Sequence, residues 1–125
     1  MPKAFMGKIL LVDLTSGTTT DEVLPEAFYQ QNLSGMGLAA RILYDRIPAG
    51  AYPLGPENML AFVSGLLTNT GSLFTGRWMA CGKSPVTGGW GDSNCGGYLS
   101  PALKRAGYDG IFVTGCAAQP VYLAV

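Results

Sequence analysis

The chain has 125 residues, which is enough to bury one hydrophobic core without disulfide bonds. Hydrophobic residues make up 48% and charged residues only 13%, so we expect other protein to cover much of the surface. The eight basic and eight acidic side chains cancel, which excludes a general electrostatic attraction to nucleic acid or to an anionic membrane. The N-terminal residues 1–5 lack a signal-peptide pattern, and no apolar run is long enough to span a bilayer. These features predict a cytoplasmic protein.

The sequence contains three cysteines and no histidine. Cys81, Cys95 and Cys116 are odd in number and lack C-x-x-C spacing, so they predict neither a disulfide framework nor a self-contained zinc or iron–sulfur site. We expect reduced thiols. Without histidine these 125 residues lack the commonest general base, and a Ser/His/Asp or Cys/His triad is excluded within them.

The first half of the sequence predicts a β-hairpin followed by two helices. The β-rich segment 7–14 and the Thr-rich segment 18–23 flank a Thr-Ser-Gly turn, which favours the hairpin. Pro25 opens a short helix that runs to about Asn32. In segment 37–47 four apolar residues recur at helical spacing and predict an amphipathic helix that ends before a proline; they are Leu38, Ala39, Ile42 and Leu43.

The second half predicts mostly strands, separated by loops rich in glycine and proline. Residues 48–58 are expected to form a fixed loop and 84–89 a shorter one. The predicted strands cover 59–63, 76–82, 110–114 and 120–125, and a helix covers 101–105 with Gly107 as its left-handed cap. The sequence stops within its last predicted strand, as in a dissected domain. Strands and helices do not alternate regularly, so we expect an α+β fold with antiparallel-rich sheets and a few short helices.

Two glycine motifs come close to nucleotide-binding patterns. Residues 35–40 have the spacing of the dinucleotide fingerprint, but a predicted helix precedes them where a buried strand is required. We interpret these glycines as close-packing residues at a corner between two helices. Gly76 and the G-K-S at 82–84 resemble a P-loop, but five residues separate the glycines where the motif has four, and Pro85 follows. A strand that ends in a Lys-Ser-Pro turn explains this segment better.

The glycine-rich segment 75–97 carries the strongest chemical signal in the sequence. It also contains four charged or amide side chains, which are Arg77, Lys83, Asp92 and Asn94. Exposed backbone N–H groups, together with an arginine and a lysine, can hold phosphate oxygens, and an asparagine carboxamide adds an oxygen ligand suited to magnesium. The alternative is a set of tight turns with solvated charges, and composition alone favours neither interpretation.

The sequence resembles the N-terminal domain of the aldehyde ferredoxin oxidoreductase family. The resemblance rests on the T-G-R of 75–77, the K-S-P-V-T-G of 83–88 and the N-C-G-G of 94–97. Further ordered blocks cover 7–17, 37–45, 53–58, 103–109 and 120–122. Ordered blocks over almost the whole chain are more specific than any single motif. The resemblance therefore predicts one N-terminal domain over 1–125, incomplete without domains that follow it.

The resemblance implies a β-structured base on which a tungsten or molybdenum bis-pterin cofactor lies. Arg77 matches an arginine near the pterin and its phosphates, and Asn94 matches an asparagine at the magnesium ion that bridges those phosphates. Gly96 and Gly97 would bring their backbone against the cofactor. Lys83 is either a further cofactor contact or a residue that closes its turn.

The reaction implied by the resemblance is the two-electron oxidation of an aldehyde with water to a carboxylic acid. Electrons would pass through a [4Fe–4S] cluster to a ferredoxin-like acceptor, and the cofactor carries the chemistry while the protein orients and tunes it. The cluster cysteines and the substrate cavity are expected in downstream domains or a second subunit. Cys81, Cys95 and Cys116 do not match the cluster ligands, so we assign no catalytic residue to this chain.

Two other functions stay open at this point. One is a stand-alone, non-catalytic module that binds a pterin or assembles through an exposed sheet, for example as a homodimer. The other is an independent nucleotide-binding enzyme, which rests only on the two incomplete motifs and would require ATP or NAD to raise the unfolding temperature.

Overall fold

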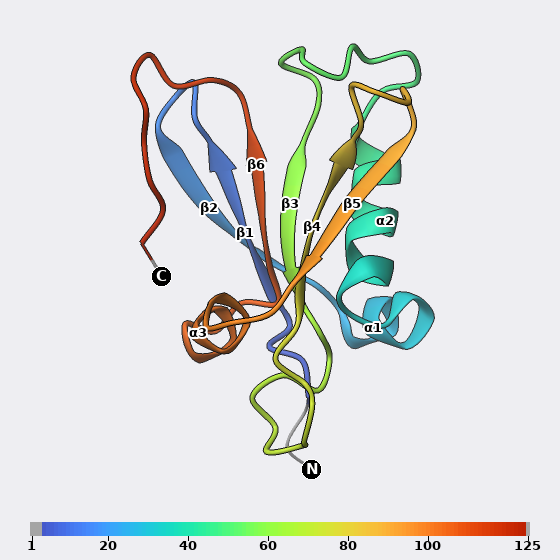
Figure 1. Cartoon of the computed structure of the whole chain (residues 1–125), viewed down its shortest axis with the longest axis vertical. Helices are drawn as coiled ribbons and strands as arrows, with labels where there is room; N and C mark the ends of the chain where they lie inside the picture. Colours follow the sequence, from blue (N-terminus) through green and yellow to red (C-terminus); the bar gives the residue numbers. More distant parts are fainter. Residues whose placement is uncertain (1–3, 125) are drawn as a thin grey trace.

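The computed structural model describes residues 4–124 as one mixed β-sheet with three helices (Figure 1). The strands are β1 (Lys8–Asp13), β2 (Thr18–Val23), β3 (Leu60–Ser64), β4 (Trp78–Lys83), β5 (Trp90–Cys95) and β6 (Gly110–Thr114). The helices are α1 (Glu26–Asn32), α2 (Met36–Arg46) and α3 (Leu99–Arg105). In the described part of the chain no helix combines the length and apolar character needed to cross a bilayer.

The strands follow the order β2-β1-β6-β3-β4-β5. Only β1 and β6 run parallel, and the four other neighbouring pairs are antiparallel. The α+β prediction with antiparallel-rich pairing is therefore confirmed. The predicted hairpin is also confirmed as β1 and β2, where the Asp13 carboxylate accepts the backbone N–H of Thr15 at 2.8 Å and stabilises the turn.

The hydrophobic core lies between one face of the sheet and helices α1 and α2. The four apolar residues that predicted the second helix are all buried there. They pack against side chains from four different strands, namely Ile9, Ala61, Val63, Cys81 and Phe112. Because side chains alternate between the faces of a strand, these residues define the face covered by the helices.

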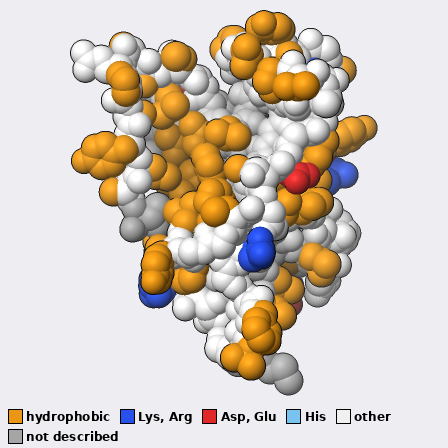
Figure 2. Space-filling model, in the orientation of Figure 1, with side chains coloured by type: hydrophobic (Ala, Val, Ile, Leu, Met, Phe, Trp, Pro, Cys, Tyr) orange, Lys and Arg blue, Asp and Glu red, His pale blue; other side chains and the backbone are white. Residues whose placement is uncertain are grey.

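The opposite face of the sheet is only partly covered. Leu103 of α3 and Ile111 of β6 are buried on that side, near the end of the sheet where α3 lies (Figure 1). Beyond α3, hydrophobic side chains gather in a hollow over β1 and β6, beside the C-terminal segment (Figure 2). Leu10, Val12 and Val113, on this face of the two strands, are only half-buried. This face therefore carries part of the apolar surface expected from the composition.

The glycines at residues 35–37 belong to the corner between α1 and α2. Gly35 has a φ of +62°, and a Cβ added to Gly37 would lie only 1.9 Å from the carbonyl oxygen of Asn32. A helix precedes this corner where a nucleotide-binding motif needs a strand, so the close-packing interpretation is confirmed. The segment between Gly76 and Ser84 likewise contains the extended strand β4, which ends at Lys83, and Ser84 accepts turn N–H groups from Val86 and Thr87 instead of forming a P-loop.

Two strand predictions differ from the structure. The glycine-rich residues 90–95, which the sequence did not predict as a strand, form β5 because antiparallel pairing with β4 supplies their hydrogen bonds. Conversely, the strand predicted over 120–125 is wrong for residues 120–124, and Val125 lies outside the described residues. The apolar side chains Val121 and Tyr122 are exposed, and no described strand pairs with this segment. A β-rich composition does not form a strand without a partner. The prediction that the sequence stops within a strand is therefore wrong for residues 120–124.

The buried carboxylate of Asp109, just before β6, links α3, α1 and the segment before β1. The ammonium of Lys104 donates to the carboxylate of Asp109, and both side chains have no exposed surface. The other oxygen of Asp109 accepts from the backbone N–H of Met6 at 2.9 Å, the N–H of Gly7 at 2.8 Å and the Tyr29 hydroxyl at 2.8 Å. Burial and the hydrogen bond to this carboxylate raise the pKa of Tyr29 well above its ordinary value, so the phenol stays a donor.

Replacing Asp109 with alanine should lower the free energy of unfolding by about 3–5 kcal/mol, because it leaves the buried Lys104 ammonium unpaired. Urea denaturation followed by circular dichroism measures this loss. The matched control is Asp45→Ala, which breaks the exposed 2.9 Å pair with Arg41 on α2 and should change stability little. Equal losses in the two variants would contradict the central role of Asp109.

Candidate functional site

Arg77 and Asn94 meet at the end of the sheet where β4 begins and β5 ends. The guanidinium Nη1 of Arg77 donates to the carboxamide Oδ1 of Asn94 at 2.6 Å, and both side chains are exposed. The pairing of Met79 with Asn94 places both on the face that the helices cover. Arg77 is two residues before Met79, so its side chain has the same orientation and reaches Asn94 diagonally across the two strands.

Gly96 and Gly97 extend this cluster beyond β5. The indole N–H of Trp78 donates to the Gly96 carbonyl at 3.0 Å and holds the chain against the start of β4. Gly97 has a φ of +93°, which a glycine adopts without strain. A Cβ added at Gly76, Gly96 or Gly97 would meet no described atom within 4 Å, so the backbone here is open to a ligand. The cluster therefore offers a guanidinium, a carboxamide and accessible main chain within one small region.

Lys83 lies away from this cluster. It ends β4, whereas Arg77 precedes that strand, so six residues of extended chain, roughly 20 Å, separate the two. The ammonium of Lys83 donates to the Ala51 carbonyl at 2.7 Å, and its backbone N–H donates to Asn58 at 3.3 Å. In this structure Lys83 therefore ties the loop 48–58 to the end of β4, and it does not join the other predicted site residues.

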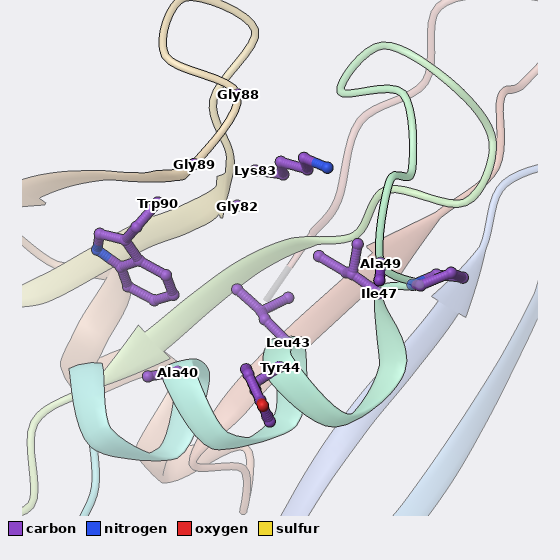
Figure 3. A pocket seen from close by; sticks show the side chains of 11 residues that line it. Ala40, Leu43, Tyr44, Ile47, Ala49, Gly82, Lys83, Gly88, Gly89 and Trp90 are labelled. Atoms are coloured by element: carbon purple, nitrogen blue, oxygen red, sulfur yellow. The ribbon is translucent and has the colours of Figure 1, made fainter.

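A groove of about 590 Å³ lies at the Lys83 end of the sheet (Figure 3). Leu43 and Tyr44 of α2 and Ile47 directly after it form one wall, and Trp90 of β5 lies across from them (Figure 3). Its lining is mainly apolar, and the side chains of Arg77 and Asn94 do not contribute to it. The groove and the Arg77 cluster are therefore separate features at opposite ends of β4.

Two buried hydroxyl groups behind Arg77 were not predicted from the sequence. The Ser100 hydroxyl donates to the Arg77 carbonyl at 3.2 Å, and the Thr68 hydroxyl donates to the Thr75 carbonyl. Ser100 and Thr68 also contact each other at 3.1 Å, although 32 residues separate them in the sequence. No local spacing relates two such residues, and only the fold brings them together.

Cys81 is the buried cysteine of β4, while Cys95 and Cys116 are exposed. All three are free thiols, as the sequence predicted. Burial raises the pKa of the Cys81 thiol to about 11, and the Asp92 carboxylate across the strand pair adds a smaller effect. Within the described residues, His, Cys, Asp and Glu side chains form no group of three or more that could hold a metal ion.

Comparisons with known proteins point to one family. A model of the family "Aldehyde ferredoxin oxidoreductase, N-terminal domain" matches residues 9–125. The tungsten-containing aldehyde ferredoxin oxidoreductase of Pyrococcus abyssi is 40% identical over 97% of this chain, which corresponds to 20% of that protein. The aliphatic sulfonate oxidoreductase, WOR-like subunit, of Pyrococcus furiosus is 36% identical over 98% of this chain and 20% of its own length.

The solved structure of the active site complex BamBC of benzoyl coenzyme A reductase, in complex with 1,5-dienoyl-CoA, is also similar. Its fold superimposes with a TM-score of 0.91 at 37% identity, over 95% of this chain and 18% of that one. The chain thus spans about a fifth of the length of the relatives it matches.

The raised pKa of Cys81 predicts a simple labelling pattern. At pH 8, well below that pKa, iodoacetamide should modify Cys95 and Cys116 and leave Cys81 unmodified, because the attacking species is the thiolate and burial also blocks access. Peptide mass spectrometry measures the modified fraction of each cysteine. Addition of urea should make Cys81 react like the others. Labelling of Cys81 in the folded protein at the same rate as Cys95 would contradict its placement in the core.

Proposed function

Because this chain belongs to the aldehyde ferredoxin oxidoreductase family, we propose that it forms one wall of a tungsten or molybdenum bis-pterin site in a larger oxidoreductase. The observation that carries the proposal is the contact between Arg77 and Asn94 beside the open backbone of Gly96 and Gly97. These are the residues that match the family's pterin-binding motifs, and the fold brings them to one end of the sheet.

The geometry of this cluster fits an anionic ligand. The guanidinium of Arg77 has five N–H donors and uses one of them on Asn94, so it keeps donors for phosphate oxygens. The carboxamide oxygen of Asn94 has a second lone pair, which suits a magnesium ion held between phosphates. Gly96 and Gly97 lack side chains that would block a planar pterin from the backbone. Arg77, Asn94, Gly96 and Gly97 would together hold the phosphate side of the cofactor.

Lys83 plays a different part in this proposal. Its ammonium already binds the Ala51 carbonyl, and it lies at the other end of β4 from Arg77. We assign it to the support of loop 48–58, and its contribution to the cofactor site is indirect at most. The turn-closing interpretation of Lys83 therefore has the better support.

When bound, the cofactor supplies two-electron redox chemistry, which in the proposed reaction converts an aldehyde and water to a carboxylic acid. This chain binds and orients one side of that cofactor and covers it from water. A [4Fe–4S] cluster, the substrate cavity and a ferredoxin-like acceptor are assigned to the remaining four fifths of the protein, by analogy with the length of the relatives. The half-buried apolar side chains opposite α1 and α2 suit contact with such downstream domains.

The names of the relatives bear on whether this chain selects the substrate of the enzyme. Proteins named as an aldehyde, a sulfonate and a benzoyl-CoA oxidoreductase or reductase share 36–40% identity with it, although their names refer to different substrates. We propose that the chain is a common cofactor base and that other domains select the substrate. A stand-alone, non-catalytic pterin-binding module is the competing proposal, and it predicts a folded chain of this length with no attached redox domains.

Arg77→Ala and Asn94→Ala should each reduce cofactor retention in the natively purified full-length protein. Loss of a hydrogen bond to a charged group contributes about 1.5–3 kcal/mol, so affinity should fall by about ten- to a hundredfold. Mass spectrometric measurement of tungsten and molybdenum per polypeptide tests this. Arg77→Lys should give an intermediate value, because a lysine keeps the charge but loses the planar pair of donors.

Arg41→Ala is the matched control for this experiment. It removes an exposed arginine of α2 that pairs with Asp45 at 2.9 Å and, among the described residues, forms no hydrogen bond or ion pair with Arg77 or Asn94, and it should leave metal content unchanged. Wild-type metal content in both the Arg77→Ala and the Asn94→Ala proteins would refute the assignment of these residues to the cofactor.

A further inference from the structure

Three buried hydroxyl groups form a chain behind the Arg77 cluster. Ser64 at the end of β3, Thr68 in the following loop and Ser100 in α3 have exposed fractions of 0%, 2% and 0%. The Ser64 and Ser100 hydroxyls lie 2.6 Å apart, and the Ser100 hydroxyl lies 3.1 Å from that of Thr68. Buried hydroxyls of this kind are costly unless each finds a partner, so a chain of three requires a defined arrangement of donors.

The direction of donation along this chain follows from the number of protons. Each hydroxyl has one proton, and Thr68 gives its proton to the Thr75 carbonyl. Thr68 can therefore only accept from Ser100, whose own proton is shared between Thr68 and the Arg77 carbonyl at 3.2 Å. Ser64 then donates to Ser100. The chain runs in one direction and ends on the two carbonyls that flank Gly76.

The segment 75–77 has few other restraints. The Arg77 carbonyl also accepts the N–H of Gly65, but that contact is long at 3.4 Å. Gly76 is exposed and has no described atom within 4 Å of a Cβ position, so packing does not fix it. The Thr75 hydroxyl also donates to the Ser72 carbonyl at 3.0 Å, but within the exposed loop. The hydroxyl chain therefore supplies the buried hydrogen bonds that hold the carbonyls of Thr75 and Arg77.

We propose that Ser100 and Thr68 are positioning residues for the anion-binding arginine. By holding the carbonyls of Thr75 and Arg77, they fix the entry into β4 and so direct the guanidinium to Asn94 and to a phosphate beside it. The inference rests on the proposed function in one respect only, namely that Arg77 binds the cofactor. The effect on the backbone of 75–77 is independent of what Arg77 binds.

The test uses Ser100→Ala and Thr68→Val in the natively purified full-length protein, with two measurements. Hydrogen–deuterium exchange of the amides of residues 75–78 reports the backbone, and it should speed up by about tenfold for the loss of one buried hydrogen bond. Tungsten plus molybdenum per polypeptide reports the site and should fall several-fold. Thr68→Ser keeps the hydroxyl and should restore both readouts.

Two controls separate positioning from a general loss of stability. Thr114→Val removes a hydroxyl that donates to the Val12 carbonyl at 3.4 Å, between β6 and β1 and away from β4, and should change neither readout. In an Arg77→Ala background, Ser100→Ala should not lower the metal content further, because a residue that acts through Arg77 has no effect once Arg77 is gone. An additional loss there would overturn the inference.

The remaining outcomes distinguish the two proposals. If Ser100→Ala and Thr68→Val leave amide exchange at 75–78 unchanged, the inference is wrong while the role of Arg77 can stand. If exchange accelerates and metal content stays at the wild-type level, although Arg77→Ala lowers it, the inference is equally overturned. If Arg77→Ala itself leaves the metal content unchanged, the proposed function fails, and the positioning role fails with it.

Discussion

The carboxylate of Asp109 is the interaction on which the rest of this fold depends. It has no exposed surface and accepts from the Lys104 ammonium, the Tyr29 hydroxyl and the backbone N–H groups of Met6 and Gly7. These donors come from α3, α1 and the entry to β1, so one side chain fixes three segments that are distant in sequence. A buried pair of this kind adds little net stability compared with apolar residues, but losing either partner is severely destabilising. Its value here is that it specifies which segments meet.

The same helix connects this ion pair to the candidate site. Ser100 and Lys104 are four residues apart on α3 and therefore lie on one face of the helix, both fully buried. Lys104 anchors α3 to the turn before β6, and Ser100 anchors it to the backbone at the entry to β4. A seven-residue helix is too short to be stable by itself, so these two polar anchors, with Leu103 between them, determine its position. The position of Arg77 thus depends on the same helix that the Asp109 ion pair holds in place.

Sequence patterns predicted the elements whose signal is local. The hairpin follows from two β-forming segments around a Thr-Ser-Gly turn, α2 follows from helical periodicity, and the corner at Gly37 follows from the helix that precedes it. The sequence patterns failed where pairing across the sheet decides the structure. Residues 90–95 were not predicted as a strand, but they form β5 by pairing with β4. Residues 120–124 were predicted as a strand, but no described strand pairs with them. Family resemblance grouped Arg77 with Asn94, which the fold brings to 2.6 Å, but it also included Lys83, which lies at the far end of β4. Thr68 and Ser100 carry no sequence signal at all.

The electrostatics of the chain are compatible with the proposed binding of an anionic cofactor by a domain of zero net charge. An exposed arginine in water, even one that contacts Asn94 closely, binds a phosphate weakly because solvent competes for both groups. If the proposed cofactor and further domains cover the cluster, water would be excluded and the same hydrogen bonds would become stronger. A single fixed guanidinium would then suffice without a generally basic surface. The apolar face of the sheet and the open Arg77 cluster are consistent with each other, since both are features of a domain that functions when it is covered.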